Sequence, residues 1–169
     1  LQSRNVITNG VKLVFVGMGL TLANTAAAQV VFTDLGFLPG MDGSSAWAMS
    51  ADGTVVAGAS DVIMGSHKRA FRWTKEDGIQ DLGSLPREEY SEAWGISGDG
   101  LVIVGQAGRI GKGRAFRWTS QTGMEDLGAL PGHSASIARD TSDDGSVVVG
   151  ASGLGWSTPA RAFRWTRAA

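Results

Sequence analysis

The chain has 169 residues, of which 43% are hydrophobic and 18% are charged, and these values are typical of one folded globular domain. Fifteen Lys and Arg against sixteen Asp and Glu leave a net charge of −1, and the arginines recur at intervals instead of clustering, which argues against a nucleic-acid partner. The absence of cysteine excludes disulfides and cysteine-based metal sites, while 25 glycines indicate many tight turns.

The first 28 residues carry the pattern of a secretory signal peptide. Arg4 and Lys12 precede an apolar run at 13–23 (LVFVGMGLTLA), and the alanines at 26–28 supply the small residues that a signal peptidase accepts before Gln29. A membrane-spanning helix needs about 20 apolar residues, and this run has only about 11. We therefore expect cleavage after residue 28, secretion to the periplasm or the extracellular space, and a mature chain without a membrane span.

Three markers recur along the rest of the chain at intervals of 45 or 47 residues. The tripeptide DLG begins at Asp34, Asp81 and Asp126, the pair D-G at Asp52, Asp99 and Asp144, and the string FRWT at Phe71, Phe116 and Phe163. A fixed period of this length is the signature of a repeat architecture. We divide the chain into a signal peptide at 1–28 and a domain at 29–169, with repeats of about 30–76, 77–121 and 122–169.

Four short segments with the character of β-strands surround each D-G pair. At the first pair, 45–50 (SAWAMS) and 54–59 (TVVAGA) flank the turn, which is a strong signal for a hairpin. The string RAFRWT at 69–74 and the segment GIQDL at 78–82 follow, with a short polar turn between them. The sequence therefore predicts an all-β fold of three four-stranded, antiparallel, propeller-like blades, with 45–47 residues in each repeat.

The string RAFRWT supplies two aromatic side chains to one face of its strand, because side chains alternate along a strand. A four-stranded sheet must bury large side chains against its neighbour, so we expect these aromatics to form the core between blades. They are Phe71, Trp73, Phe116, Trp118, Phe163 and Trp165. A stacking platform for sugars or bases is the alternative.

The second arginine of each string, at Arg72, Arg117 and Arg164, falls on the opposite face of the strand. We expect these arginines to form structural ion pairs with Asp81, Asp126 or other acidic neighbours, and ligand binding is the alternative.

The repeats in the sequence do not begin and end at the same residues as the predicted blades. The third repeat ends after its RAFRWT string, whereas an unmatched DLG segment at 30–36 (VVFTDLG) precedes the first blade. In propellers an N-terminal strand of this kind commonly completes the last blade and closes the ring, which would also remove exposed strand edges. Three blades are fewer than the four to eight usual for a propeller, so a homodimer with a six-bladed ring, an open arc and a fragment of a longer repeat protein remain alternatives.

The combined pattern consists of DLGxLPG, S-A-x-x-I-S-x-D-G-x-V-V-V-G-x-S, RAFRWT and G-M-x-D-L-G, and it covers about residues 30 to 166 three times. It resembles the HAF-type extracellular repeat of secreted bacterial proteins. The resemblance implies export and a β-repeat fold, and some members of the family look like passengers of autotransporters. It implies no catalytic residues.

Motifs of catalysis and metal binding are missing from the sequence. There is no nucleophile elbow, and neither His67 nor His133 stands in a metal-binding spacing, so we assign no catalytic residue, metal or cofactor. The repeats differ in length only between the D-G pair and FRWT, so a specific function is most plausible in these variable loops. Our candidates for ligand contact there are His67, Arg109, Lys112 and Trp156.

Two functions of different classes follow. The first is a secreted, non-catalytic β-repeat protein that binds a glycan or protein partner through its loops. The alternative is a propeller-type hydrolase or lyase with loop carboxylates as acid and base, and it rests on analogy of fold. Its candidates are Asp42, Asp61, Glu88 and Glu89. A third possibility is a fragment of a longer extracellular repeat protein or autotransporter passenger.

Overall fold

The computed structural model describes residues 30–62, 67–109, 111–153 and 159–167, and nearer the N-terminus the backbone of four two-residue strands. These short strands are β1 (Ile7–Thr8), β2 (Val11–Lys12), β3 (Phe15–Val16) and β4 (Gly19–Leu20), and they pair antiparallel as β1 with β2 and β3 with β4. The chain divides into two compact units, Leu1–Asp34 and Leu35–Ala169. The predicted signal peptide at 1–28 otherwise lies outside the described residues.

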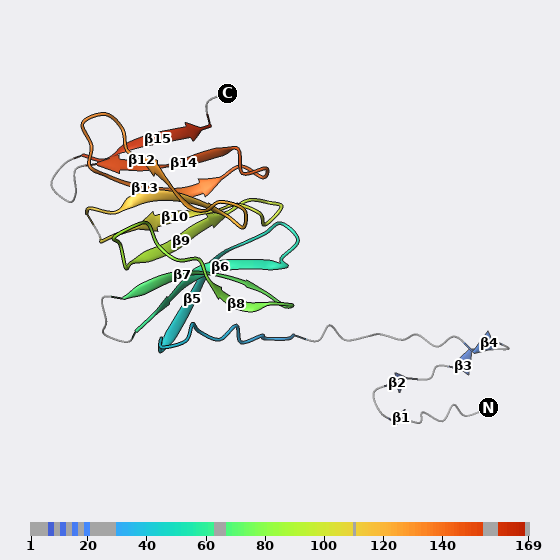
Figure 1. Cartoon of the computed structure of the whole chain (residues 1–169). Coiled ribbons are helices and arrows are strands. Elements are labelled where there is room, and N and C mark those ends of the chain that lie inside the picture. The colour runs from blue at the N-terminus through green and yellow to red at the C-terminus, as the bar shows by residue number, and fades with distance from the viewer. Residues whose placement is uncertain are drawn as a thin grey trace. The chain divides into compact units, whose positions relative to one another are not determined.

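The described residues of the second unit form 11 antiparallel strands in three sheets, which follow one another in chain order (Figure 1). The first sheet consists of β5 (Gly43–Met49), β6 (Val55–Asp61), β7 (Lys68–Thr74) and β8 (Gly78–Asp81). The second consists of β9 (Ser91–Ile96), β10 (Ile103–Ala107), β11 (Arg114–Thr119) and β12 (Gly123–Gly128), and the third of β13 (Ala135–Thr141), β14 (Val147–Gly153) and β15 (Arg161–Thr166). Strands that follow one another along the chain are neighbours in each sheet.

The all-β fold with antiparallel strands in three sheets is confirmed. The first two sheets have the four strands predicted around each D-G pair, and the third has three among the described residues. The sheets do not begin where the predicted repeats begin, because the DLG segments in β8 and β12 are the fourth strands of the preceding sheets. The part of the chain from 82 to 90 then links the first sheet to the second.

Successive sheets pack face to face, with a face of small side chains against a face of aromatic ones. Between the first and second sheets, Val55, Ala57 and Ala70 belong to the same buried cluster as Phe116 and Trp118. Burial of this apolar surface is the main source of stability for a protein without disulfides.

The interface between the second and third sheets repeats this arrangement. Its small-residue side consists of Val102, Val104 and Ala115, and Phe163 and Trp165 pack against them. The small residues are therefore as regular a part of the repeat as the aromatic residues.

The six repeated aromatics differ in burial. Phe71 and Phe116 are fully buried, whereas Trp73, Trp118, Phe163 and Trp165 keep part of their surface exposed. Phe163 is more exposed than its two counterparts because it stands in the three-stranded sheet, whose outer strand β15 is mostly exposed.

Each D-G turn is closed by a serine and an aspartate. In the first turn, Ser50 Oγ donates to Asp52 Oδ1 at 2.6 Å and accepts the N–H of Val55 at 3.0 Å. Gly53 has a φ of 71°, a left-handed conformation that glycine adopts without strain. Ser97 with Asp99 and Ser142 with Asp144 form the same network in the other two sheets. These hydrogen bonds stabilise the turn between the first and second strands of each sheet.

Acidification is expected to weaken these turns. The pKa values of Asp52 and Asp144 are lowered from 3.8 to about 2, and that of Asp99 is also lowered, because serine hydroxyls and backbone N–H groups donate to the ionised carboxylates. Since the folded-state pKa lies below the unfolded-state value, the stabilisation is present above about pH 4 and is lost as the pH falls towards about 2. The midpoint of thermal unfolding, followed by circular dichroism, should fall over this interval.

The variant Asp52→Asn provides the comparison, because it cannot gain a proton at this turn. Its unfolding midpoint should fall less between about pH 4 and 2 than that of the wild type. An equal decrease in both proteins would assign the acid sensitivity to other carboxylates.

The DLG aspartates pair with a different arginine from the one expected. Arg69 Nη2 lies 3.1 Å from Asp81 Oδ2, and Arg114 Nε lies 3.3 Å from Asp126 Oδ1. Phe71 stands opposite Asp81 in the ladder, so the aspartate shares the face of Arg69 and Phe71, not that of the second arginine. The predicted pairing of the second arginine with the DLG aspartate is therefore wrong.

The second arginines have other acidic neighbours. Arg72 Nη1 lies 3.6 Å from Asp77 Oδ2, and Arg117 Nη1 lies 3.7 Å from Glu125 Oε2. Arg164 has no ion pair among the described residues. These pairs are close to the surface, so each contributes about 1 kcal/mol or less to stability.

The expected ring closure by the segment 30–36 is not confirmed. Residues 30–38 form no strand, and the outer edge of β15 has no partner strand in the described part of the chain. Val31 and Phe32 are 73% and 96% exposed. Three blades are fewer than the four to eight of an ordinary propeller ring.

Candidate functional site

Two of the predicted ligand contacts, His67 and Arg109, line one cleft at the end of the sheets that carries the variable loops. The cleft has a volume of about 240 Å³, and Arg87, Glu88, Glu89 and Tyr90 complete its lining. We call these six residues the loop-end cleft. His67 precedes β7 in the first sheet, 87–90 belong to the segment between β8 and β9, and Arg109 follows β10 in the second sheet. The site thus lies where two repeats meet.

Backbone hydrogen bonds position the cleft residues. Gly108 N donates to the Tyr90 carbonyl oxygen at 2.7 Å, which joins the variable loop of the second sheet to the segment before β9. Gly108 has a φ of 94°, a left-handed conformation that glycine adopts without strain. Arg87 has a φ of 70°, the left-handed conformation that is uncommon outside glycine.

The cleft carries charges of both signs. His67 Nδ1 lies 4.0 Å from Glu89 Oε2, and both side chains are well exposed. Beside the cleft, Lys68 Nζ lies 2.9 Å from Glu92 Oε1, whose side chain is buried. Burial raises the pKa of the Tyr90 phenol, and its contact with Glu92 raises it further, so the hydroxyl stays protonated at neutral pH. The cleft therefore presents guanidinium, carboxylate and hydrogen-bonding groups to a polar ligand.

The other predicted contacts do not join this cleft. Lys112 is exposed in the turn that follows Arg109, where its N–H donates to the Arg109 carbonyl oxygen at 2.9 Å. Trp156 lies outside the described residues. Of the carboxylates proposed for a hydrolase, Glu88 and Glu89 line the cleft, whereas Asp42 and Asp61 lie together at the edge of the first sheet, where Asp42 N donates to the Asp61 carbonyl oxygen at 2.9 Å.

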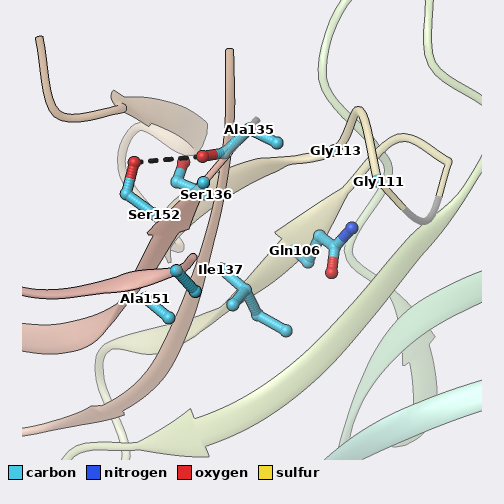
Figure 2. A pocket seen from close by; sticks show the side chains of 10 residues that line it. Gln106, Gly111, Gly113, Ala135, Ser136, Ile137, Ala151 and Ser152 are labelled. Carbon is cyan, nitrogen blue, oxygen red and sulfur yellow. Dashed lines mark hydrogen bonds between the residues drawn. The ribbon is translucent and has the colours of Figure 1, made fainter. Parts of the chain in front are cut away.

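A second pocket lies between the second and third sheets, with a volume of about 130 Å³ (Figure 2). Ser136 and Ser152 contribute the hydroxyl groups of its lining, and Gln106 of β10 also lines it. Ser152 Oγ donates to the Ala135 carbonyl oxygen at 3.0 Å and accepts the N–H of Leu130 at 3.1 Å. The serine is thus engaged in holding the backbone.

The contact between His133 Nδ1 and Ser152 Oγ, at 3.2 Å, has the elements of a nucleophile and base. Ser60 occupies the same place in the first sheet, donates to the Gly43 carbonyl oxygen and accepts the N–H of Leu38, with no histidine in these bonds. Because the serine makes the same two backbone bonds in both sheets, its role is structural.

A row of stacked side chains along the first strands was missed by sequence reasoning. The rings of Trp47 and Trp94 stack with centroids 4.5 Å apart and planes 15° from parallel. The guanidinium of Arg139 lies 4.9 Å from the Trp94 ring, and Lys68 Nζ lies 5.6 Å from the Trp47 ring. We call these four residues the bulge ladder, since cation and ring contacts link all three sheets.

A β-bulge explains why these side chains meet. Trp47, Trp94 and Arg139 are the extra residues at the register shifts of β5, β9 and β13. A bulge redirects its residue out of the regular alternation of the strand. Each of the three residues follows an alanine in the first strand of its sheet, so aligning the repeats by residue would have shown that they share one position.

Glycine stands opposite each bulge. A Cβ atom at Gly58, Gly105 or Gly150 would overlap a backbone carbonyl oxygen of the first strand, that of Ser45, Glu92 or Ile137. The glycine at this position of the second strand of each sheet is therefore required by the bulge.

The described part of the chain contains no group of three or more His, Asp or Glu side chains placed to hold an ion. Among the same residues, no helix is long and apolar enough to cross a membrane.

Comparison with known proteins bears on the fold. No family model and no curated protein matches the chain. Among solved structures, the crystal structure of TolB from Acinetobacter baumannii is similar, with 15% sequence identity and a TM-score of 0.51 over 74% of this chain and 30% of that one. The fold resembles part of a β-propeller. At this identity the likeness concerns the fold alone, and the chain spans less than a third of TolB.

Proposed function

We propose that the chain is a secreted, non-catalytic β-repeat protein of the HAF type, and that it binds a charged segment of a protein partner in the loop-end cleft. The observation that carries the proposal is the meeting of His67 and Arg109, from variable loops of two different repeats, with 87–90 in one cleft. Repeated residues are explained by packing between sheets, whereas Arg87, Glu88, Tyr90 and Arg109 have no counterpart of the same type in the other repeats. His67 and Glu89 fall at the positions of Lys112 and Asp42, which are also basic and acidic. Loops placed by a rigid scaffold are the usual location of binding residues.

The chemistry of the cleft favours a peptide over a sugar. Arg87 and Arg109 can bind carboxylates through paired N–H groups, and Glu88 and Glu89 can accept from cationic side chains. Among the residues that line the cleft, Tyr90 is the one aromatic, and it is partly buried. The lining therefore offers little exposed ring surface for stacking against a sugar, and it suits a segment that carries both signs of charge.

A binding role also agrees better with the arrangement of the carboxylates than a hydrolase or lyase does. Only two of the four candidate carboxylates line the cleft, and His67, the one imidazole there, is exposed and 4.0 Å from Glu89. General acid and base catalysis needs groups held at hydrogen-bond distance from the reacting atoms, preferably away from bulk water.

Arg109→Ala is expected to weaken binding about tenfold or more, because it removes charge-assisted hydrogen bonds worth about 1.5–3 kcal/mol. The measurement starts with an array of peptides bearing mixed charges and an array of glycans, and the best binder is then titrated by calorimetry. Lys112→Ala is the matched control, since it removes a cation from the same loop but outside the cleft, and it should change affinity less than twofold.

Equal affinities for Arg109→Ala, Lys112→Ala and wild type would remove the cleft as the site. A signal on the glycan array alone would contradict the peptide assignment. Turnover of any arrayed probe that is abolished by Glu88→Gln or Glu89→Gln would replace binding by catalysis.

A further inference from the structure

The two interfaces between sheets use equivalent residues, and the third sheet presents the same small-residue face without a cover. Val55, Ala57 and Ala70 of the first sheet and Val102, Val104 and Ala115 of the second are at most 7% exposed. Their counterparts in the third sheet are Val147, Val149 and Ala162. Val149 is 42% exposed, and Ala162 is exposed too. A face that accepts an aromatic sheet twice within the chain is thus available a third time.

A serine hydroxyl joins the sheets in both interfaces. Ser91 Oγ accepts the N–H of Ala70 at 3.0 Å and donates to the Gly83 carbonyl oxygen at 2.6 Å. Ser136 Oγ likewise accepts the N–H of Ala115 at 2.9 Å and donates to the Gly128 carbonyl oxygen. In each case the donor is the alanine of RAFRWT, and the serine is the first or second residue of the first strand of the next sheet.

The groups for a third contact of this kind are also present, a serine hydroxyl in the first sheet and an alanine N–H in the third. Ser44 Oγ donates to the Gly36 carbonyl oxygen at 2.6 Å, as Ser91 and Ser136 do to their glycines, but in the described residues no backbone N–H donates to it. Ala162 is the alanine of the third RAFRWT. The N–H of Ala162 is therefore the donor that matches Ser44.

The segment 31–36 (VFTDLG) corresponds to 78–83 (GIQDLG) and 123–128 (GMEDLG), which supply the outer strands of the first two sheets. In the first sheet, Arg72 stands opposite Gln80 and Trp73 opposite Ile79. The same register would place Thr33 opposite Arg164 and Phe32 opposite Trp165. Phe32, at 96% exposure, would then lie against an aromatic ring instead of water.

Among the three bulge residues, those of the first and third sheets match each other. The guanidinium of Arg139 stacks on Trp94, and Trp47 of the first sheet, with Lys68 Nζ 5.6 Å from its ring, is 36% exposed. Adjacent sheets place their bulge residues in contact, so a sheet added to the third would bring its own bulge residue to Arg139. Where that sheet is the first sheet of another molecule, the residue is Trp47.

We infer that a second copy of the chain docks head to tail on the third sheet, with its first sheet against Val149 and Ala162 and its segment 31–36 paired with β15. Because the contact joins unlike faces of the two copies, the assembly has no free face only when the copies form a closed ring. Two copies with three blades each give six blades, which is the one multiple of three within the four to eight blades usual for a propeller. Each copy then donates one strand and receives one. The inference uses the sheet faces and not the loop-end cleft, so it stands or fails separately from the proposed function.

The test is the solution mass of the full chain, measured by light scattering after size exclusion from micromolar to about 100 µM. Twice the chain mass is expected. Val149→Arg should convert the dimer to a monomer, since a charge would be buried at the interface but stays exposed in the single chain, which can therefore still fold. Leu101→Arg, at an exposed leucine in the D-G turn of the second sheet, is the matched control and should remain dimeric. A wild-type monomer, a larger polymer or a Val149→Arg dimer would overturn the inference.

Strand exchange has its own test, because the chain has no cysteine. Thr33→Cys combined with Arg164→Cys should give a covalent dimer on mild oxidation, visible on a denaturing gel without reductant. Thr33→Cys combined with Leu101→Cys should not. Cross-linking within one chain, or none with the first pair, would contradict the exchange of the segment 31–36.

Discussion

Gly105→Ala is expected to destabilise the protein by about 3 kcal/mol or more, because the added methyl group has no space opposite the bulge of β9. Its Cβ atom would overlap the carbonyl oxygen of Glu92 and also approach the Phe116 ring at 2.8 Å. Relief would require the bulge to straighten, which would draw Trp94 out of the bulge ladder. Urea unfolding followed by tryptophan fluorescence measures both effects, the loss of free energy and the changed surroundings of the ring.

Gly153→Ala is the matched control for this variant. Gly153 also lies in a second strand, β14, but the nearest atom to an added Cβ atom would be 3.5 Å away, an ordinary contact. The free energy of unfolding should change by about 0.5 kcal/mol or less. Similar costs at Gly105 and Gly153 would show that the bulge does not determine the requirement for glycine.

Phe116→Ala is expected to cost about 3–5 kcal/mol, since the ring is fully buried between the first and second sheets and its removal leaves a cavity. Phe163→Ala removes the same side chain from the same place in the third sheet, where part of the ring is exposed. This variant should cost less, about 1–2 kcal/mol. The comparison is made by urea unfolding of both variants under identical conditions in the Val149→Arg background, in which the third sheet is expected to keep its three strands.

Equal costs at Phe116 and Phe163 would contradict the description of the third sheet as the less buried one. A loss of only about 1 kcal/mol at Phe116 would instead mean that the interface collapses around the cavity, so that the two sheets pack adaptably.

The strands were predictable because each one is bounded by its own local signal. The D-G pair ends the first strand and starts the second, and the alternation of Phe71 and Trp73 with polar residues identifies the third. The strands observed at Gly43–Met49, Val55–Asp61 and Lys68–Thr74 begin and end within two residues of those expected.

Pairing between strands was less predictable, because register depends on bonds between segments distant in sequence. Alternation placed Arg72 on the face opposite Phe71, but it could not show that Asp81 shares the face of Phe71. The bulges were missed for the same reason, since a regular alternation through Trp47 or Trp94 hides the extra residue.

The candidate site was predictable in part. The variable loops pointed to His67 and Arg109 because a scaffold of repeats leaves its differences in the loops. Their meeting with 87–90 depends on the path of the chain from β8 to β9, which brings the end of one repeat against the loop of the next. Glu88 and Glu89 were considered only as acids and bases, because their sequence context does not reveal that cationic side chains face them across a cleft.

The serine that joins neighbouring sheets makes the chain extensible. Each sheet offers an alanine N–H on one side and a serine hydroxyl on the other, and these groups come from the same positions of every repeat. A further unit of 45 or 47 residues placed between two sheets would meet the same serine hydroxyl and alanine N–H groups that its neighbours already use. Duplication or loss of whole units could therefore change the number of blades over evolutionary time without a new interface, whereas a change of a few residues in strand length would disturb both neighbours at once.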